Sequence, residues 1–118
     1  MTTAPNLYIG LGSAVYALVK ADGHLQSAES IKARMLLVEE PHGELAMQSF
    51  IMREHYGIPA DEAYNFALRC FASNKKALNK SLKEHFTSLI QKIAEADQTV
   101  SSQEIEFIKR FRRDIKRF

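Results

Sequence analysis

The sequence predicts an all-α protein, a compact bundle of about six helices in a single domain spanning residues 1–118. Two observations lead to this prediction. Apolar residues recur at spacings of three and four along six segments, and no segment shows the period-two alternation of a half-buried strand. In addition, one helix–loop–helix pattern occurs twice with an offset of 75 residues, from Asp22 to Asp97, which divides the bundle into two related halves.

The first helix is expected to start at Thr2 or Thr3 followed by Pro5, and to end near residue 20 or 21. Proline suits the first turn of a helix, where its missing N–H is not needed. Gly23 then accepts the left-handed backbone that closes a helix. One apolar stripe at helical spacing is formed by Leu7, Leu11, Ala14, Val15, Leu18 and Val19.

Two further helices are expected over residues 27–39 and 43–56. Pro41 and Gly43 end the first of them, and Gly57 followed by Pro59 ends the second. The residues expected to face the core from residues 27–39 are Ala28, Ile31, Met35 and Val38, with Leu36 and Leu37 widening the stripe. Those expected from residues 43–56 are Leu45, Met47, Phe50 and Ile51.

The fourth helix is expected to start at residue 60 or 61, because Asp61 and Glu62 favour the positive N-terminal end of a helix dipole. A break at residues 73–74 precedes a fifth helix over residues 75–95 and a sixth from residue 102 to the C-terminus. The apolar stripes of these three helices are Ala63, Phe66, Ala67 and Cys70; Leu78, Leu82, Phe86, Leu89, Ile90 and Ile93; and Ile105, Ile108, Phe111 and Ile115.

The internal repeat reproduces the apolar face of the first helix in the fifth. A shift of 75 residues pairs apolar residues of the first helix with apolar residues of the fifth: Leu7 with Leu82, Leu11 with Phe86, Val15 with Ile90 and Leu18 with Ile93. The same shift pairs Asp22 with Asp97 and Glu29 with Glu104. We therefore expect two helix–loop–helix units that share one core.

The loop of the first unit, from Asp22-Gly23 to Glu29, is similar to the last eight positions of an EF-hand calcium loop. In that register Leu18 and Lys20 occupy positions 1 and 3, where calcium needs oxygen ligands. The second loop has Ile93 at position 1 and Gln98 in place of glycine. Neither loop alone is expected to hold calcium tightly.

Two interpretations of the loop acids follow from the residues. In the first they serve the local structure, with Ser101 and Glu104 forming a capping box at the start of the sixth helix. In the second the two loops jointly form a weak site for a divalent cation (Ca, Mg or Zn) with Asp22, Glu29, Asp97 and Glu104 as ligands. The second interpretation requires the fold to bring these four residues together.

The repeated pattern, an apolar helix followed by Ala-Asp-Gly-x-[Leu/Ile/Val]-x-x-x-Glu and another helix, resembles the TerB-like tellurite-resistance family. The family includes the TerB-like module of some DnaJ-type co-chaperones, and the resemblance covers nearly the whole chain. It implies an all-α bundle of two helix–loop–helix halves with a non-enzymatic role in stress response or as a scaffold. It also implies a metal site at Asp22, Glu29, Asp97 and Glu104. Gln98 departs from the glycine that the family usually has.

Composition sets the remaining expectations. Cys70 is the only cysteine, so an internal disulfide is impossible and a cytoplasmic location is expected. No apolar run approaches the ~20 residues of a membrane-spanning helix. The charge is unevenly divided: residues 1–70 carry five Lys/Arg and eight Asp/Glu, a net −3, whereas residues 71–118 carry eleven and six, a net +5.

The C-terminal segment supplies an alternative function. Six cations surround the apolar residues Phe111 and Ile115 of the sixth helix: Lys109, Arg110, Arg112, Arg113, Lys116 and Arg117. Such a helix is able to bind nucleic acid or an anionic surface. The same residues also suit the negative C-terminal end of a helix dipole, and a solvated basic face is common.

The sequence contains no pattern typical of catalysis or of a phosphate-binding loop. We therefore expect a non-enzymatic module that acts through a protein partner, with nucleic acid as the alternative ligand. Neither the partner nor the oligomeric state follows from the residues.

Overall fold

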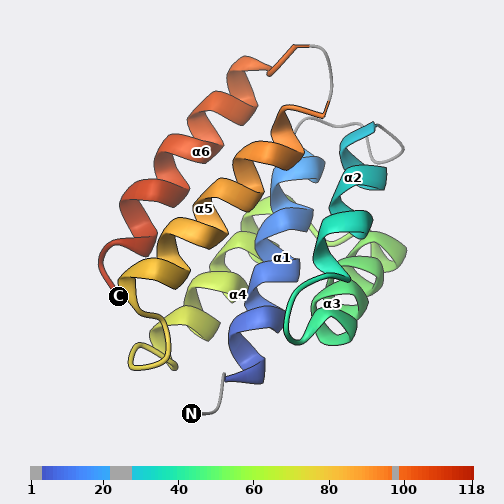
Figure 1. Ribbon diagram of the computed structural model, residues 1–118. Coiled ribbons are helices and arrows are strands. Elements are labelled where there is room, and N and C mark those ends of the chain that lie inside the picture. The colour runs from blue at the N-terminus through green and yellow to red at the C-terminus, as the bar shows by residue number, and fades with distance from the viewer. Residues whose placement is uncertain (1–3, 22–27, 97–98) are drawn as a thin grey trace.

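The computed structural model describes residues 4–21, 28–96 and 99–118 (Figure 1). These residues form six helices and no strand, in the order α1 (Pro5–Ala21), α2 (Ala28–Leu37), α3 (Gly43–Tyr56), α4 (Ala60–Ala72), α5 (Lys80–Ala94) and α6 (Ser102–Ile115). The predicted all-α bundle of about six helices is therefore confirmed. The bounds of α1, α3 and α4 also agree closely with the sequence prediction.

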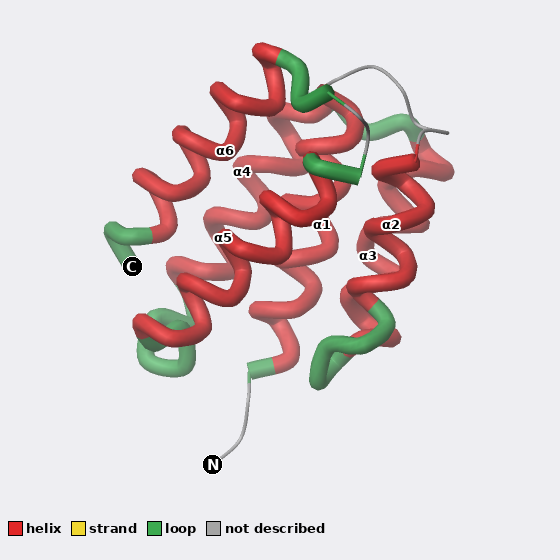
Figure 2. The backbone as a smooth tube through the Cα atoms, turned by 45° about the horizontal axis from the view of Figure 1, so that its top comes forward, coloured by secondary structure: helices red, strands yellow, loops and turns green. Residues whose placement is uncertain are grey.

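Helix α1 lies at the centre of the bundle, with the other helices arranged around it (Figure 2). Its most extensive contacts are with α4 and α3, and it also contacts α2, α5 and α6. The sequence predicted one apolar stripe on α1, but every residue from Gly10 to Val19 is buried. A helix that is apolar on all sides is buried on all sides, which is the case here.

Small residues allow the neighbouring helices to approach α1 closely. A Cβ atom added to Gly12 would lie 2.1 Å from the backbone oxygen of Ala46 in α3. One added to Gly10 would lie 2.8 Å from Cβ of Cys70 in α4. Both distances are shorter than van der Waals contact, so α1 needs glycine at these positions for α3 and α4 to pack as they do.

Polar side chains join α1 to the same two helices. The Ser13 hydroxyl donates a hydrogen bond to the backbone oxygen of Ala63 at 2.7 Å, and the Ser49 hydroxyl donates one to the backbone oxygen of Ile9 at 2.7 Å. Tyr16 donates to the backbone oxygen of Ile58 at 2.8 Å. These bonds satisfy hydroxyl groups that would otherwise be costly to bury.

The internal repeat is reflected in the core. Leu11, Val15 and Leu18 of α1 and their counterparts Phe86, Ile90 and Ile93 of α5 are all fully buried. Helices α2 and α6, which follow the two loops, both begin at the end of the bundle where α1 and α5 finish (Figure 1). The two helix–loop–helix units thus contribute corresponding residues to one hydrophobic core.

The prediction for α2 was wrong in one respect. The helix spans Ala28–Leu37, and its buried residues are Glu29, Ser30, Ala33 and Leu37. Leu37 is fully buried and Leu36 packs against the core, as expected, but three other side chains expected to face the core are exposed, with exposed fractions of 63% for Ile31, 60% for Met35 and 46% for Val38. Polar contacts of α2 with α3, and of Glu40 just after α2 with His85 of α5, hold the helix in this orientation, and apolar periodicity does not reveal them.

Helix α5 begins at Lys80, five residues later than predicted. Asn79 caps it by accepting a hydrogen bond from the backbone N–H of Leu82 at 2.9 Å. Residues 73–79 form turns that connect α4 to this cap. An asparagine cap stabilises a helix start at its own position, which explains why the helical spacing of earlier residues does not extend α5.

Candidate functional sites

Two carboxylates of the internal repeat are buried at one end of the bundle. Glu29 lies in the first turn of α2 and Glu104 in the first turn of α6, and their exposed fractions are 1% and 0%. A glutamate is rarely buried to this extent unless its charge is compensated. The repeat therefore places chemically equivalent, buried acids at the starts of two corresponding helices.

Glu104 forms the capping box that the sequence predicted. Its backbone N–H donates to the Ser101 hydroxyl oxygen at 3.1 Å, and the backbone N–H of Ser101 donates to Glu104 Oε1 at 2.9 Å. The second carboxylate oxygen, Oε2, is buried and has no hydrogen-bond partner among the described atoms. The cap thus uses one oxygen of Glu104 and leaves the other available to a donor or a cation.

The remaining two residues of the expected metal site, Asp22 and Asp97, lie outside the described residues. Within residues 4–21, 28–96 and 99–118, no group of three or more His, Cys, Asp or Glu side chains is arranged to hold a metal ion. Any joint site would combine Glu29 and Glu104 with acids from the two loops. Carboxylate oxygens of this kind are the ligands that Ca²⁺ and Mg²⁺ prefer.

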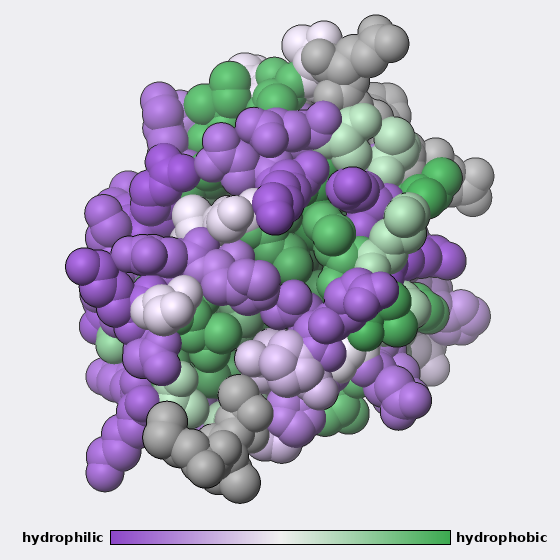
Figure 3. Space-filling model, viewed as in Figure 1, coloured by the Kyte–Doolittle hydropathy of each residue, from purple (hydrophilic) through white to green (hydrophobic). Residues whose placement is uncertain are grey.

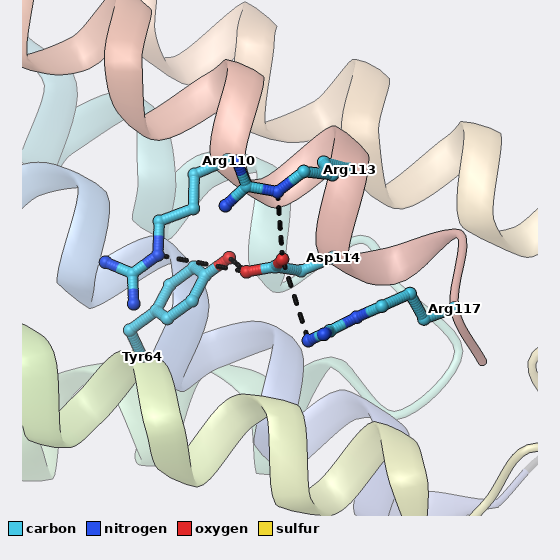
Figure 4. A network of polar contacts seen from close by, with 5 residues as sticks. All are labelled: Tyr64, Arg110, Arg113, Asp114 and Arg117. Carbon is cyan, nitrogen blue, oxygen red and sulfur yellow. Dashed lines mark hydrogen bonds and ion pairs between the residues drawn. The ribbon is translucent and has the colours of Figure 1, made fainter.

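A second polar cluster connects α6 to α4 around Asp114, whose side chain is only 8% exposed. The Tyr64 hydroxyl donates a hydrogen bond to Asp114 Oδ2 at 2.6 Å (Figure 4). Three arginines surround the same carboxylate: the distance to Asp114 is 3.8 Å from Arg110 Nε, 3.4 Å from Arg113 Nε and 3.6 Å from Arg117 Nη2. The guanidinium carbon of Arg110 also lies 4.2 Å from the centre of the Tyr64 ring.

The pKa values in this cluster follow from the contacts. Burial raises the pKa of Asp114, but the hydrogen bonds from Tyr64 and Arg113 and the charges of Arg113 and Arg117 outweigh it, so the pKa lies below its usual value. Burial and the hydrogen bond to Asp114 raise the pKa of Tyr64. Asp114 is therefore a carboxylate and Tyr64 a neutral donor at neutral pH, which makes the cluster a stable structural link between α4 and α6.

The structure distributes the six C-terminal cations over different surroundings. Arg110, Arg113 and Arg117 converge on Asp114, whereas Arg112 donates to Gln91 Oε1 of α5 at 3.1 Å. Lys109 is exposed and lines a shallow hollow between α4 and α6. Three of the six are thus ion-paired with one carboxylate, although the side chains of Arg113 and Arg117 remain largely exposed.

A basic groove runs between α5 and α6, with a volume of about 730 Å³. We call it the α5–α6 groove; its cationic residues are Lys80, Lys83, Lys92, Arg112 and Lys116, and its acids are Glu84 and Glu95. Figure 3 shows mainly hydrophilic side chains over these two helices. Sequence reasoning identified Arg112 and Lys116 but missed the three lysines of α5. The excess of cations in residues 71–118 was the signal that pointed to them.

Cys70, the single thiol, is half-buried in α4. Burial raises its pKa, although the charges of Arg53 and Arg69 partly oppose this effect. A thiol with a raised pKa is a poor nucleophile at neutral pH.

The chain matches no protein-family model, no curated protein and no solved structure. In the described part of the chain, no helix combines the length and apolar character needed to cross a membrane. The fold and these sites define an all-α bundle with buried acids at two corresponding helix starts and a basic groove between its last two helices.

Proposed function

We propose that the protein is a non-enzymatic scaffold module of the TerB-like type, which acts in the stress response in the cytoplasm and through a protein partner. The observation that carries the proposal is the equivalence of Glu29 and Glu104, which are 75 positions apart, buried, and in the first turns of α2 and α6. The six-helix architecture and the shared core of the two units support the same assignment. The raised pKa of Cys70 argues against this thiol as a catalytic nucleophile.

The same proposal includes a weak divalent-cation site formed by Asp22, Glu29, Asp97 and Glu104. The buried Oε2 atom of Glu104 supports it, because an unpaired carboxylate oxygen away from water is costly and a cation would compensate for it. Capping and ligation are compatible at Glu104, since the cap uses Oε1. Weak affinity is expected because Leu18 and Lys20 stand where a calcium loop has two oxygen ligands.

Thermal unfolding in the presence of metal tests this site. A ligand at ten times its Kd stabilises the folded state by about 1.4 kcal/mol, so Ca²⁺, Mg²⁺ or Zn²⁺ is expected to raise the Tm of the wild type relative to EDTA. Asp22→Asn is expected to remove this increase. Glu84→Gln, which neutralises an exposed acid near the start of α5, is the matched control and is expected to keep it. Equal Tm values with EDTA and with each of the three cations would rule the site out.

A second candidate function is supported by the α5–α6 groove. Five cations against two acids leave it with a net positive charge, which suits an anionic surface such as the phosphate backbone of nucleic acid. The cations proposed for this role are those of the groove, because they are not paired with a buried carboxylate as Arg110, Arg113 and Arg117 are. In this function both α5 and α6 contact the anionic surface, whereas the sequence predicted that the basic last helix alone would bind it.

A gel-shift titration at several salt concentrations separates the two groups of cations. Replacing Lys83, Arg112 and Lys116 by Gln is expected to weaken binding and to lower the slope of log K against log salt by about 2 to 3. The control replaces three exposed lysines outside the groove, Lys75, Lys76 and Lys109, and removes the same charge. If both triple variants lose affinity equally, the groove is not the binding surface.

A further inference from the structure

The outward face of α2 is apolar and its inward face is partly polar, the reverse of a typical surface helix. Ile31, Met35 and Val38 point outward with exposed fractions of 63%, 60% and 46%. Glu29 and Ser30 are among the residues buried on the opposite side. A contiguous apolar stripe at the surface is characteristic of an interaction site.

Polar contacts hold α2 in this orientation. Toward α3, the Ser30 hydroxyl donates to Glu54 Oε2 at 3.2 Å, and Arg34 forms an ion pair with Glu54. Just after α2, the carboxylate of Glu40 lies 2.9 Å from His85 Nε2 of α5. Rotating α2 to bury its apolar stripe would break these contacts. The stripe is therefore presented outward on a fixed helix.

The residues beside the stripe carry a specific charge pattern. With about 100° of rotation per residue, Ile31 lies about 40° to one side of Met35 and Lys32 about 60° to the other. Val38 and Glu39 are in the turn that follows α2, where their backbone N–H groups donate to the carbonyl oxygens of Arg34 and Leu36. The chain therefore continues close to the helical path, which places Val38 on the flank of Ile31 and Glu39 on the flank of Lys32. One flank of α2 is thus apolar, and the other carries one positive and one negative charge at opposite ends. We call the three apolar residues, together with Lys32 and Glu39, the α2 seam.

We propose that α2 packs antiparallel against α2 of a second copy of this chain, with the two-fold axis passing beside Met35. Such an axis reverses the helix direction but keeps each flank opposite the same flank of the other copy. Ile31 then faces the partner's Val38, and Lys32 faces the partner's Glu39, each within about one residue of exact register. Each contact occurs twice, so the α2 seam is complementary to itself in both shape and charge.

The surroundings of the seam favour the same partner. A groove of about 620 Å³ between α2 and α5 is lined by Ile31, Lys32 and Met35 of the seam and, on the side of α5, by Lys92 and Glu95. Apolar side chains gather between α5 and α2 in the space-filling view (Figure 3). A partner of a single charge sign would oppose either Lys32 or Glu39, whereas a second copy pairs each of them with its opposite charge.

The expected dimer is weak. Three apolar side chains, two on the ten-residue helix and one just after it, bury less surface than the roughly 800 Å² per partner of a standard interface. We therefore expect a Kd on the order of 100 µM, with monomers at low micromolar concentration.

Sedimentation equilibrium from about 10 µM to about 1 mM tests this pairing. The wild type is expected to dimerise over this range and Met35→Glu to remain monomeric. Lys32→Glu and Glu39→Lys are each expected to weaken the dimer about tenfold, because two attractive pairs become repulsive. The double variant Lys32→Glu/Glu39→Lys restores both pairs and is expected to dimerise like the wild type.

Several results would overturn the proposal. They are a wild type that stays monomeric throughout, a dimer unaffected by Met35→Glu, or a double variant no stronger than either single variant. Glu84→Lys, a charge reversal on exposed α5 surface, is expected to leave the dimer unchanged. Thermal unfolding of each variant confirms that the fold is retained, as expected for substitutions of largely exposed side chains.

Discussion

At the scale of single residues, the best-defined interaction is the hydrogen bond from Tyr64 to Asp114. It joins α4 to α6 through a carboxylate that is 8% exposed and surrounded by three arginines. Sequence patterning did not indicate it, because one aspartate among six cations at a chain end is typical of a solvated surface. Only the packing of α6 on α4 reveals that this aspartate is buried and that Tyr64 reaches it.

Replacing Tyr64 by Phe removes the donor and leaves a buried carboxylate oxygen short of a partner. We expect a loss of about 2 kcal/mol in the free energy of unfolding at neutral pH, measured by chemical denaturation. Tyr56→Phe is the matched control, because Tyr56 is 69% exposed, and its effect is expected to stay within about 0.5 kcal/mol. Equal stabilities for the two variants would show that the bond contributes nothing.

The same variant has an expected pH dependence. The pKa of Asp114 is lowered in the folded state, so its ionisation stabilises the fold at pH values above its unfolded pKa of about 3.9. This contribution is lost as the pH falls through the lower, folded pKa. The stability difference between the wild type and Tyr64→Phe is therefore expected to shrink below about pH 4. A difference that grows on acidification would contradict this linkage.

At the scale of helices, the sequence predicted where most elements lie better than which way they face. Proline, glycine and the Ser101–Glu104 box are local signals, and α1, α3, α4 and the start of α6 follow them. Ile51 of α3 and Ile105 of α6, which were expected to face the core, are 41% and 44% exposed. The other corrections concern α5, whose start is set by Asn79, and α2, which is held by the contact of Ser30 with Glu54 and of Glu40, just after the helix, with His85. Those last contacts join segments distant in sequence, so periodicity could not predict them.

The candidate sites show the same difference between features that local sequence predicts and features that depend on how the helices pack. The repeat alone singles out Glu29 and Glu104, because a 75-residue offset is visible in the order of the residues. The α5–α6 groove and the exposed seam of α2 depend on which faces of separate helices meet. Neither is encoded in the spacing of one segment.

The close packing of α1 against α3 leads to a prediction at this scale. In Gly12→Ala the new Cβ would lie 2.1 Å from the Ala46 backbone oxygen, so the helices must separate. We expect a loss of about 3 kcal/mol or more in the free energy of unfolding. Gly57→Ala is the comparison: its φ of 60° is strained for alanine but nothing crowds it, so about 1 kcal/mol is expected. If chemical denaturation showed a larger loss for Gly57→Ala than for Gly12→Ala, the close packing of α1 against α3 would be contradicted.

At the scale of the whole molecule, the bundle contains two helix–loop–helix units, α1–α2 and α5–α6, together with α3 and α4, which pack most extensively on α1. Their corresponding residues share one core, and their buried glutamates lie in the first turns of α2 and α6. In the proposed function the two loops act as one site, because neither has enough oxygen ligands alone. The α5–α6 groove and the α2 seam lie on other surfaces of the same bundle.

The most direct test of the joint site is the stoichiometry of cation binding by calorimetric titration. The account predicts one divalent ion per chain, with the binding heat abolished by either Asp22→Asn or Asp97→Asn alone, since each loop supplies part of a single site. Glu84→Gln is expected to bind like the wild type. Two ions per chain, each lost with only one of the two substitutions, or no binding heat with Ca²⁺, Mg²⁺ and Zn²⁺ would contradict it.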